Sequence, residues 1–295
     1  MKHIFICLLI LVISCKEESK PECNYIKDYY PQIYKADHEF QLGNYEKAIE
    51  YYQRAFNTCE PLNTPLYYEI RKFAKASAIL NKNDVALEFI KKDIEHGYTI
   101  TSFVNDSIFS NVFESKEGKA LINNYENLRS AYMSAVDLEF RKEMLEIWRL
   151  DQAFRQDPIK VDSIDAIHEK KLMTIFETKG YPNRNLIGHP SIDRKFIDVA
   201  MILRHTDDSI RKHYFIPKLR EFVKDGSCPP NDLAVVQDWY YLRRGEKQIY
   251  GMFPIKKDNT ISDLKQLDVN RASIGLPTLE QKRKRDSLFL VNQGR

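Results

Sequence analysis

The sequence predicts an all-α protein in two parts: a short array of paired helices, then an α-helical bundle domain with a minor β segment. Three observations support this prediction. The 295 residues include only ten glycines, and stretches rich in Leu, Ile, Lys, Glu and Tyr repeat their apolar side chains at helical spacing. The sequence has no runs of alternating Val and Thr, which are typical of strands. Because domains commonly contain about 100 to 200 residues, the length favours two domains.

The charge of the chain argues against nucleic-acid binding. The formal net charge is +3, and basic residues are interleaved with acidic residues along the whole sequence. Proteins that bind nucleic acid usually gather their basic residues in a patch or stripe. We therefore expect no nucleic-acid partner. The sequence also contains no glycine-rich phosphate loop and no nucleophile-elbow serine, and it predicts no cofactor.

The start of the chain has the pattern of an exported protein. A short cationic start precedes an apolar run at 4–13, which is shorter than the roughly 20 residues that a membrane-spanning helix needs. Ser14 and Cys15 follow, and the letters "VISC" resemble a lipobox, after which the cysteine is diacylated and becomes the mature N-terminus. The resemblance implies a signal peptide at 1–14 and a lipid on Cys15. The alternative is an ordinary signal peptide with an incidental cysteine.

Residues 15–26 are expected to form a tether. The stretch "KEESKPE" is charged and poor in apolar residues, as in a solvated linker. Its first three letters resemble the surface-export signal of lipoproteins in one phylum of Gram-negative bacteria. This resemblance implies an outer-membrane lipoprotein that is held to the membrane by the lipid on Cys15 and displayed outward. Display on the periplasmic side is the alternative.

Cys23 and Cys59 are predicted to form a disulfide. An antiparallel helix pair at 28–42 and 44–58 would place both cysteines at the same end of the pair. Exported proteins meet an oxidising compartment, and such a bridge contributes a few kcal/mol. Two separate thiols are the alternative, because the sequence does not fix the Cα separation. Cys228 lies in a proline-flanked turn with no local histidine, so we do not expect a nucleophile there.

Residues 36–61 resemble a tetratricopeptide repeat. In that family, small residues let two helices approach closely, tyrosines fill the gap between them, and a glycine allows a tight turn. The matching positions are Ala36, Gly43, Tyr45, Ala48, Tyr52 and Ala55, with Pro61 one place late.

Two further segments are expected to continue this array to give tetratricopeptide-like repeats at 27–132. Residues 65–96 again read as helix, turn and helix, with the turn at 81–84. Residues 98–128 are degenerate, with Asp106 as a helix cap, as expected of a terminal unit. The family usually holds a peptide or another protein, so the resemblance implies such a partner at the repeats. The alternative is that the array only supports the domain that follows.

Residues 137–295 are predicted to form a helical domain that carries polar residues on core-facing stripes. Asp151 lies on an apolar helical stripe, and Arg155 follows it by four residues, so the two can pair. His205 lies at the edge of a second stripe and Asp238 on a third. Buried charges are unfavourable unless they are paired. The polar residues expected to act together are Asp151, Gln152, Arg155, His205, Asp238, Gln248 and Tyr250.

Three local predictions describe the elements around these residues. A buried stripe from Phe196 to Leu203 predicts one helix. Asn231, after two prolines, is the expected cap of the helix that contains Asp238. The letters "QIYGMF" at 248–253 predict the minor β segment.

The combination of these features resembles domain-of-unknown-function family 6624, across about 145–251. Two positions depart from the family pattern: Arg204 stands where Gln is expected, and Trp239 stands where Arg is expected. If the family residues at these positions complete a ligand site, the departures imply altered specificity or lost activity. The family brings no known reaction. The matching features are Asp151, Gln152, Arg155, "KGYP" ending at Pro182, Gly188, His205, Pro217, Asp238 and the "QIYG" ending.

Two interpretations of the polar group remain open. As an enzyme site, Asp151, His205 and Asp238 would be the catalytic candidates of a hydrolase, because histidine exchanges protons near neutral pH. The ligand-binding candidates would then be Arg155, Gln152, Gln248 and Tyr250. As a structural network, the same residues would fix helix register. The histidines and acids at 205–213 match no metal-ligand spacing, so no metal is predicted.

Overall fold

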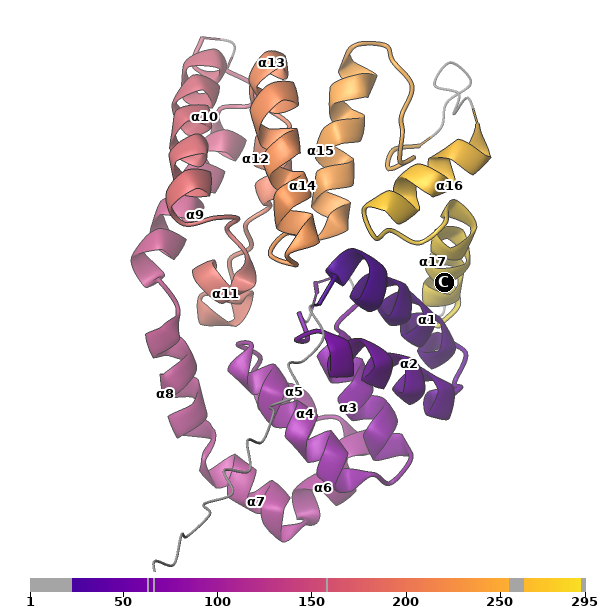
Figure 1. The fold of residues 1–295 in the computed structure, drawn as a ribbon. Helices are drawn as coiled ribbons and strands as arrows, with labels where there is room; N and C mark the ends of the chain where they lie inside the picture. Colours follow the sequence, from indigo (N-terminus) through magenta and orange to yellow (C-terminus); the bar gives the residue numbers. More distant parts are fainter. Residues whose placement is uncertain (1–22, 63, 66, 158, 255–262, 293–295) are drawn as a thin grey trace, which may run out of the picture.

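The computed structural model describes residues 23–62, 64–65, 67–157, 159–254 and 263–292 (Figure 1). Within these ranges the regular secondary structure is entirely helical, which confirms the predicted all-α class. No helix among the described residues is both long enough and apolar enough to span a membrane. The predicted signal peptide, the lipid site at Cys15 and most of the tether lie outside the described residues.

The first region consists of two helical hairpins and a series of shorter helices. Its elements are η1 (Tyr25–Tyr29), α1 (Tyr30–Gln41), α2 (Tyr45–Thr58), α3 (Glu69–Ile79), α4 (Asn83–Glu95), α5 (Thr101–Val104), η2 (Ser107–Phe109), α6 (Ser110–Glu114), α7 (Lys116–Asn123) and α8 (Tyr125–Ala135).

The second region begins after α8 and contains both long and very short helices. Its elements are α9 (Leu138–Ala153), α10 (Val161–Thr178), α11 (Arg184–Ile187), η3 (Pro190–Ile192), α12 (Val199–Leu203), α13 (Asp208–Ile210), η4 (Arg211–Phe215), α14 (Ile216–Lys224), α15 (Pro230–Arg243), α16 (Leu264–Ser273) and α17 (Leu279–Asn292).

The first hairpin packs as the repeat spacing predicts. Ala36 of α1 and Ala48 and Ala55 of α2 are fully buried, so the two helices approach closely. Gly43 connects the helices with a φ of +80°, a conformation that glycine adopts without steric strain. In the second hairpin Asn81 takes the equivalent positive φ of 57°. Since α4 already begins at Asn83, the turn ends earlier than the sequence analysis expected.

The structure joins Cys23 and Cys59, the pair expected from the helix hairpin, in a disulfide with a Cα separation of 5.1 Å. Cys23 precedes η1, and Cys59 follows the last residue of α2. In the degenerate third unit, Asp106 caps η2 as predicted, because its Oδ1 accepts from the backbone N–H of Ile108 at 3.1 Å. Cys228 is a buried free thiol.

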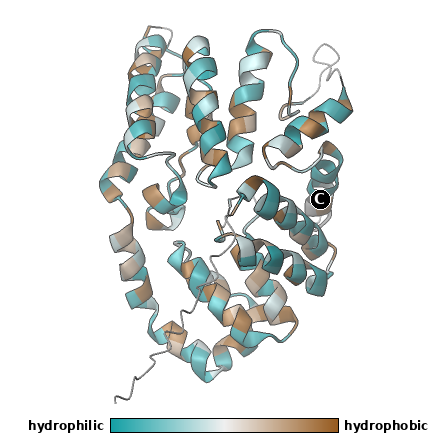
Figure 2. Ribbon diagram, in the orientation of Figure 1, coloured by the Kyte–Doolittle hydropathy of each residue, from teal (hydrophilic) through white to brown (hydrophobic). Residues whose placement is uncertain are grey.

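The hydrophobic cores divide near the predicted domain boundary. Two cores belong to the first region and extend from Tyr29 to Leu121, whereas the core of the second region extends from Phe140 to Leu276. Figure 2 shows hydrophobic and hydrophilic residues interspersed along the helices, as expected of amphipathic helices that each bury one side.

The two regions touch on both sides of their junction (Figure 1). On one side α8 leads into α9, and the Tyr98 ring lies against the ring of His189, with 4.1 Å between centroids. On the other side α1 packs against α17, and η1 packs against α14. The glycine at 275 is required there, because a Cβ would come within 2.7 Å of the Tyr30 ring. The C-terminal domain therefore faces the first helical hairpin directly.

Candidate functional site

Four of the predicted site residues come together near the end of α9. Asp151 is fully buried, and its Oδ1 lies 2.9 Å from Nδ1 of His205 in the turn after α12. Nη2 of Arg155 lies 3.1 Å from the same oxygen, and Nε of Arg155 donates to the Asp151 backbone carbonyl at 2.6 Å. Gln152 is exposed, yet its Nε2 donates to Asp151 Oδ2 at 2.7 Å. The buried carboxylate is thus satisfied by three side chains.

Asp165 and His168 on α10 complete this group, and the sequence analysis missed both. Asp165 pairs with Arg155, with 3.0 Å between Nη1 and Oδ2, so the arginine links α9 to α10. His168 is almost fully buried, and its Nδ1 has no hydrogen-bond partner within the described residues. Burial lowers the pKa of His168, and the nearby carboxylate of Asp151 opposes this change. Helical spacing could have indicated that His168 is buried, because it precedes the buried Leu172 by four residues and so lies on the same helix face.

The Asp151 and His205 pair has the geometry of a histidine base oriented by a carboxylate. The carboxylate holds Nδ1, and Nε2 of His205 has no hydrogen-bond partner among the residues that the structure describes. Such a histidine can take a proton from a substrate that reaches Nε2. The side chain of His205 is 18% exposed, but neither of the two cavities described below is lined by His205 or Asp151.

Asp238, Gln248 and Tyr250 form a separate polar group. Asp238 is fully buried on α15 and accepts from the backbone N–H groups of Ile249, Tyr250 and Met252 at 2.9 to 3.0 Å. Burial raises the pKa of Asp238, and these three donors oppose the rise. Within the described residues, no hydrogen bond or ion pair joins these three residues to Asp151 or His205.

This arrangement also explains why the predicted β segment at 248–253 is wrong. The segment forms a loop whose N–H groups bond to a side chain instead of a neighbouring strand. Gln248 strengthens the loop by bonding to both backbone groups of Phe253, at 2.8 and 3.2 Å. The predicted cap at Asn231 is wrong as well, because α15 already begins at Pro230. The two prolines start the helix themselves.

Arg204 and Trp239, at the two positions that differ from the pattern the sequence resembles, contact each other. The guanidinium of Arg204 lies 4.3 Å from the ring centroid of Trp239, and the indole Nε1 donates to the Arg204 carbonyl at 2.9 Å. Cation–π stacking of this kind is favourable between Arg and Trp. The two positions therefore act as one pair beside the turn that carries His205.

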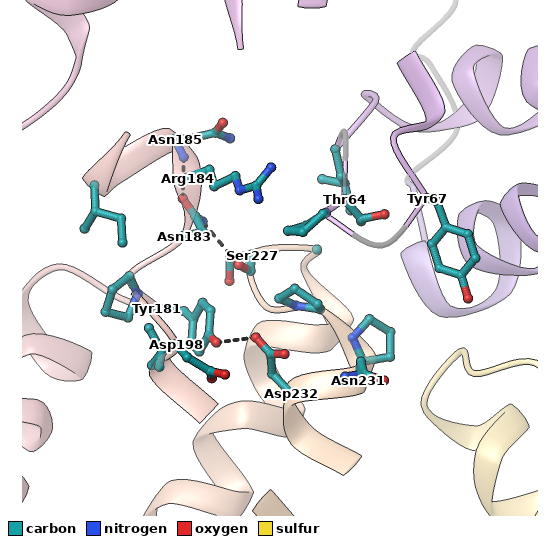
Figure 3. A pocket seen from close by; sticks show the side chains of 18 of the residues that line it. Thr64, Tyr67, Tyr181, Asn183, Arg184, Asn185, Asp198, Ser227, Asn231 and Asp232 are labelled. Carbon is teal, nitrogen blue, oxygen red and sulfur yellow. Dashed lines mark hydrogen bonds between the residues drawn. The ribbon is translucent and has the colours of Figure 1, made fainter. Parts of the chain in front are cut away.

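A cavity of about 370 Å³ lies at the junction of the two regions (Figure 3). One wall comes from α1 and the loop before α3. The opposite wall comes from α11, the segment before α12 and the start of α15. The sequence analysis did not predict this cavity, since its walls belong to segments that are far apart in the chain. Its labelled polar residues are Thr64, Tyr67, Tyr181, Asn183, Arg184, Asn185, Asp198, Ser227, Asn231 and Asp232.

Two carboxylates lie close together on the wall formed by the C-terminal domain (Figure 3). Asp198 caps α12 by accepting from the N–H of Met201 at 2.8 Å. Half-buried Asp232 accepts from the hydroxyl of Tyr181 at 2.6 Å. Burial raises the pKa of Asp232 to about 6; the hydrogen bond from Tyr181 opposes the rise and Asp198 adds to it. The wall therefore carries a carboxyl group that titrates near pH 6.

Phe196 and Arg184 add an apolar and a cationic side chain to the same cavity. Phe196 is 55% exposed, so its predicted place in a buried helical stripe is wrong; α12 begins only at Val199. Arg184 donates to the hydroxyl of Tyr98 at 3.3 Å and has no carboxylate partner within the described ranges. The cavity thus combines apolar walls with a few polar groups of both signs.

Comparisons with known proteins found no similarity that could explain this site. No protein-family model matches the chain, and neither the curated proteins nor the solved structures gave a match. The resemblances to tetratricopeptide repeats, to a lipobox and to family 6624 stay predictions from the residues. In the part of the chain that the structure describes, no group of three or more His, Cys, Asp or Glu side chains is arranged to hold a metal ion.

Proposed function

We propose that this protein is a cell-envelope lipoprotein that binds a peptide segment of a partner protein where its helical repeats meet its C-terminal domain. The lipobox-like start and the lipid expected on Cys15 support an outer-membrane location. The observation that carries the binding proposal is the cavity of about 370 Å³ that both regions line. Ligand pockets occur preferentially at domain interfaces and commonly have volumes of about 300 to 1,000 Å³.

The lining of the cavity favours a peptide. Its walls are mainly apolar, with several prolines and with Tyr34, Tyr67 and Phe196 as aromatic side chains. Asn183 and Asn231 lie among them, and side-chain amides can both donate to and accept from a peptide backbone. A peptide segment would therefore find apolar contacts for its side chains and hydrogen-bond partners for its main chain.

Site-specific crosslinking tests this proposal in the full-length lipidated protein. A photoreactive phenylalanine analogue replaces Phe196 in one variant. In a matched control it replaces Val269, which is 61% exposed on α16 and does not line the cavity. We expect a discrete adduct in the native envelope from position 196 and none from position 269. Equal adducts from both positions, or none from position 196, would contradict binding at the cavity.

Protease treatment of intact cells tests the location separately. An outward-facing protein is digested while the outer membrane is intact, whereas a periplasmic one is digested only after the membrane is breached. Resistance before breaching would exclude surface display without affecting the binding proposal.

A second candidate function is a hydrolase centred on His205. The observation that favours it is the 2.9 Å contact between His205 Nδ1 and the buried Asp151 carboxylate. His205→Ala would abolish turnover of a panel of ester and peptide substrates while leaving the thermal unfolding temperature nearly unchanged. His213→Ala, at an exposed histidine, serves as the control. Loss of the fold in Asp151→Asn and His205→Ala would instead mark the group as a structural network.

A further inference from the structure

A second cavity, of about 240 Å³, lies between α1 and α17. It is separate from the junction cavity, although Tyr34 and Tyr67 line both. The rings of these two tyrosines pack against each other, with 4.9 Å between centroids. The tyrosine pair therefore forms a shared wall with one cavity on each side.

The lining of this second cavity is strongly basic. It contains no carboxylate: besides the two tyrosines, the side chains that form it are Pro277, Gln281, Lys35, His38, Lys282, Lys284 and Arg285. Lys35 is exposed on α1; its Nζ lies 5.8 Å from the centroid of the Tyr51 ring, and it forms no ion pair within the described residues. A concave site with one sign of charge concentrates ligands of the opposite sign.

The cations of α17 are only weakly held by their own helix. Lys282 and Arg285 share the carboxylate of Asp286 at 2.7 and 3.0 Å, and Lys284 pairs with Glu280 at 2.8 Å. Glu280 and Lys284 are both more than 60% exposed. Exposed ion pairs between helix neighbours contribute little, so these lysines are free to turn towards a ligand.

The charge balance around the cavity leaves two positive charges. The four permanent cations of the lining face the two carboxylates of α17. Behind α1, the buried Asp37 pairs with Lys72 and also interacts electrostatically with Arg285. Beneath the tyrosines, the buried Arg271 interacts electrostatically with Asp268. The charges of these inner groups balance each other. The excess of two positive charges therefore belongs to the side chains that line the cavity.

We propose that the second cavity binds a phosphate monoester. Such a group carries a charge of about −1.5 to −2 at neutral pH and three acceptor oxygens, which matches the two uncompensated cations and the several N–H donors of the lining. A carboxylate brings only one negative charge and would leave the site half neutralised. This site is independent of the peptide cavity and of its proposed function.

Titration of the full chain with inorganic phosphate at constant ionic strength tests the proposal. Lys284→Glu removes the excess charge and should raise the Kd for phosphate at least tenfold. Lys91→Glu is the matched control, because Lys91 is likewise exposed on a helix and paired with a glutamate four residues away, Glu95. The control should bind within twofold of the wild type. Saturable binding that survives Lys284→Glu, or no saturable binding by the wild type, would overturn the proposal.

Vesicles identify the source of the phosphate group. The full chain carrying Cys15→Ser, which removes the expected lipid anchor, is sedimented with vesicles that contain phosphatidic acid or only phosphatidylcholine. Sedimentation with phosphatidic acid alone, lost in Lys284→Glu and kept in Lys91→Glu, assigns the site to a lipid headgroup. Phosphate binding without sedimentation assigns it to a soluble phosphate ester. Equal sedimentation of the two variants contradicts a role of the cavity at the membrane.

Discussion

The repeats and the C-terminal domain use buried charge in different ways. In the hairpins of the first region, two buried carboxylates pair with side chains of a neighbouring helix: Asp37 of α1 bonds to Lys72 of α3, and Asp93 of α4 lies 3.1 Å from Arg71 of α3. The hairpin helices α1 to α4 are regular and satisfy most of their own backbone groups. The buried charges therefore serve to join one helix to another.

In the C-terminal domain, several buried charges bond to the backbone of turns and loops, whereas Asp151 is held by side chains. Arg211 donates to the carbonyls of Leu203, Arg204 and Thr206. Arg271 does the same for Tyr250 and Pro277, and Asp238 accepts three loop N–H groups. Because this domain contains very short helices and irregular connections, its backbone groups need side-chain partners. The comparison predicts that single polar residues matter more to this domain than to the repeats.

The largest effect is expected from Asp238→Ala. The substitution leaves the N–H groups of Ile249, Tyr250 and Met252 without their acceptor, and each such loss costs about 1 to 3 kcal/mol. We expect the free energy of unfolding to fall by about 4 kcal/mol in a urea titration. Asp238→Asn keeps one acceptor oxygen and should lose less. A loss below about 1 kcal/mol for Asp238→Ala would contradict the comparison.

Within the repeats, the largest effect should come from a covalent bond. Cys23→Ser opens the disulfide to Cys59, which closes a sequence separation of 36 residues. In the chain-entropy account this lowers the free energy of unfolding by roughly 3.8 kcal/mol. Thermal unfolding of Cys23→Ser, Cys59→Ser and the double variant should give the same decrease. A further decrease in the double variant would show that each sulfur contributes separately.

Asp232→Asn tests the junction, where the two regions meet. The pKa of Asp232 is raised to about 6 in the folded protein, so its contribution to stability is full below about pH 4 and is lost as the pH rises through 6. Asparagine does not titrate. After allowance for partial exposure, the variant should gain about 1 to 2 kcal/mol over the wild type between pH 4 and pH 7.

Urea unfolding of both proteins across this pH range gives the difference directly. The value at pH 4 is the internal control, because Asp232 is largely protonated there in the folded wild type. A difference that does not change with pH would mean that Asp232 does not titrate in this range.

The smallest effect is expected from Asp106→Ala in the repeats. Asp106 caps η2 through the N–H of Ile108 and pairs with Lys75 at 2.9 Å. Loss of a helix cap typically costs about 1 kcal/mol. Ser115→Ala, which removes the cap of α7 at Gly118, is the comparison variant and should give a similar decrease in urea unfolding. A decrease as large as that for Asp238→Ala would remove the contrast between the two regions.

Sequence reasoning predicted the first helix hairpin better than the arrangement of the C-terminal domain. The positions of Ala36, Ala48 and Ala55 predicted a close helix pair, because helical spacing alone decides which side chains share a face. The same reasoning correctly placed Asp151 on a buried stripe and brought Arg155 beside it. These are local relations along one helix, and the sequence contains all the information that they need.

Relations between distant segments were not predictable in the same way. Helical spacing indicated that Asp238 points inward, but not that a loop eleven to fourteen residues later would bond to it. The junction cavity depends on how the two regions dock, which the spacing of side chains within one helix does not reveal. Helical spacing therefore predicted Phe196 as a core residue, although its side chain is exposed and lines the cavity. Asp165 and His168 were missed because their partners lie on α9, across a helix contact.

The disulfide between Cys23 and Cys59 also determines how the protein responds to mechanical force. If the lipid proposed at Cys15 holds the chain to a membrane, any pull from that side enters the fold at Cys23. The covalent bond passes the force directly to Cys59 at the end of α2. The force therefore bypasses helices α1 and α2. Helix α1 then keeps its position in the cavity wall when the anchor is under tension.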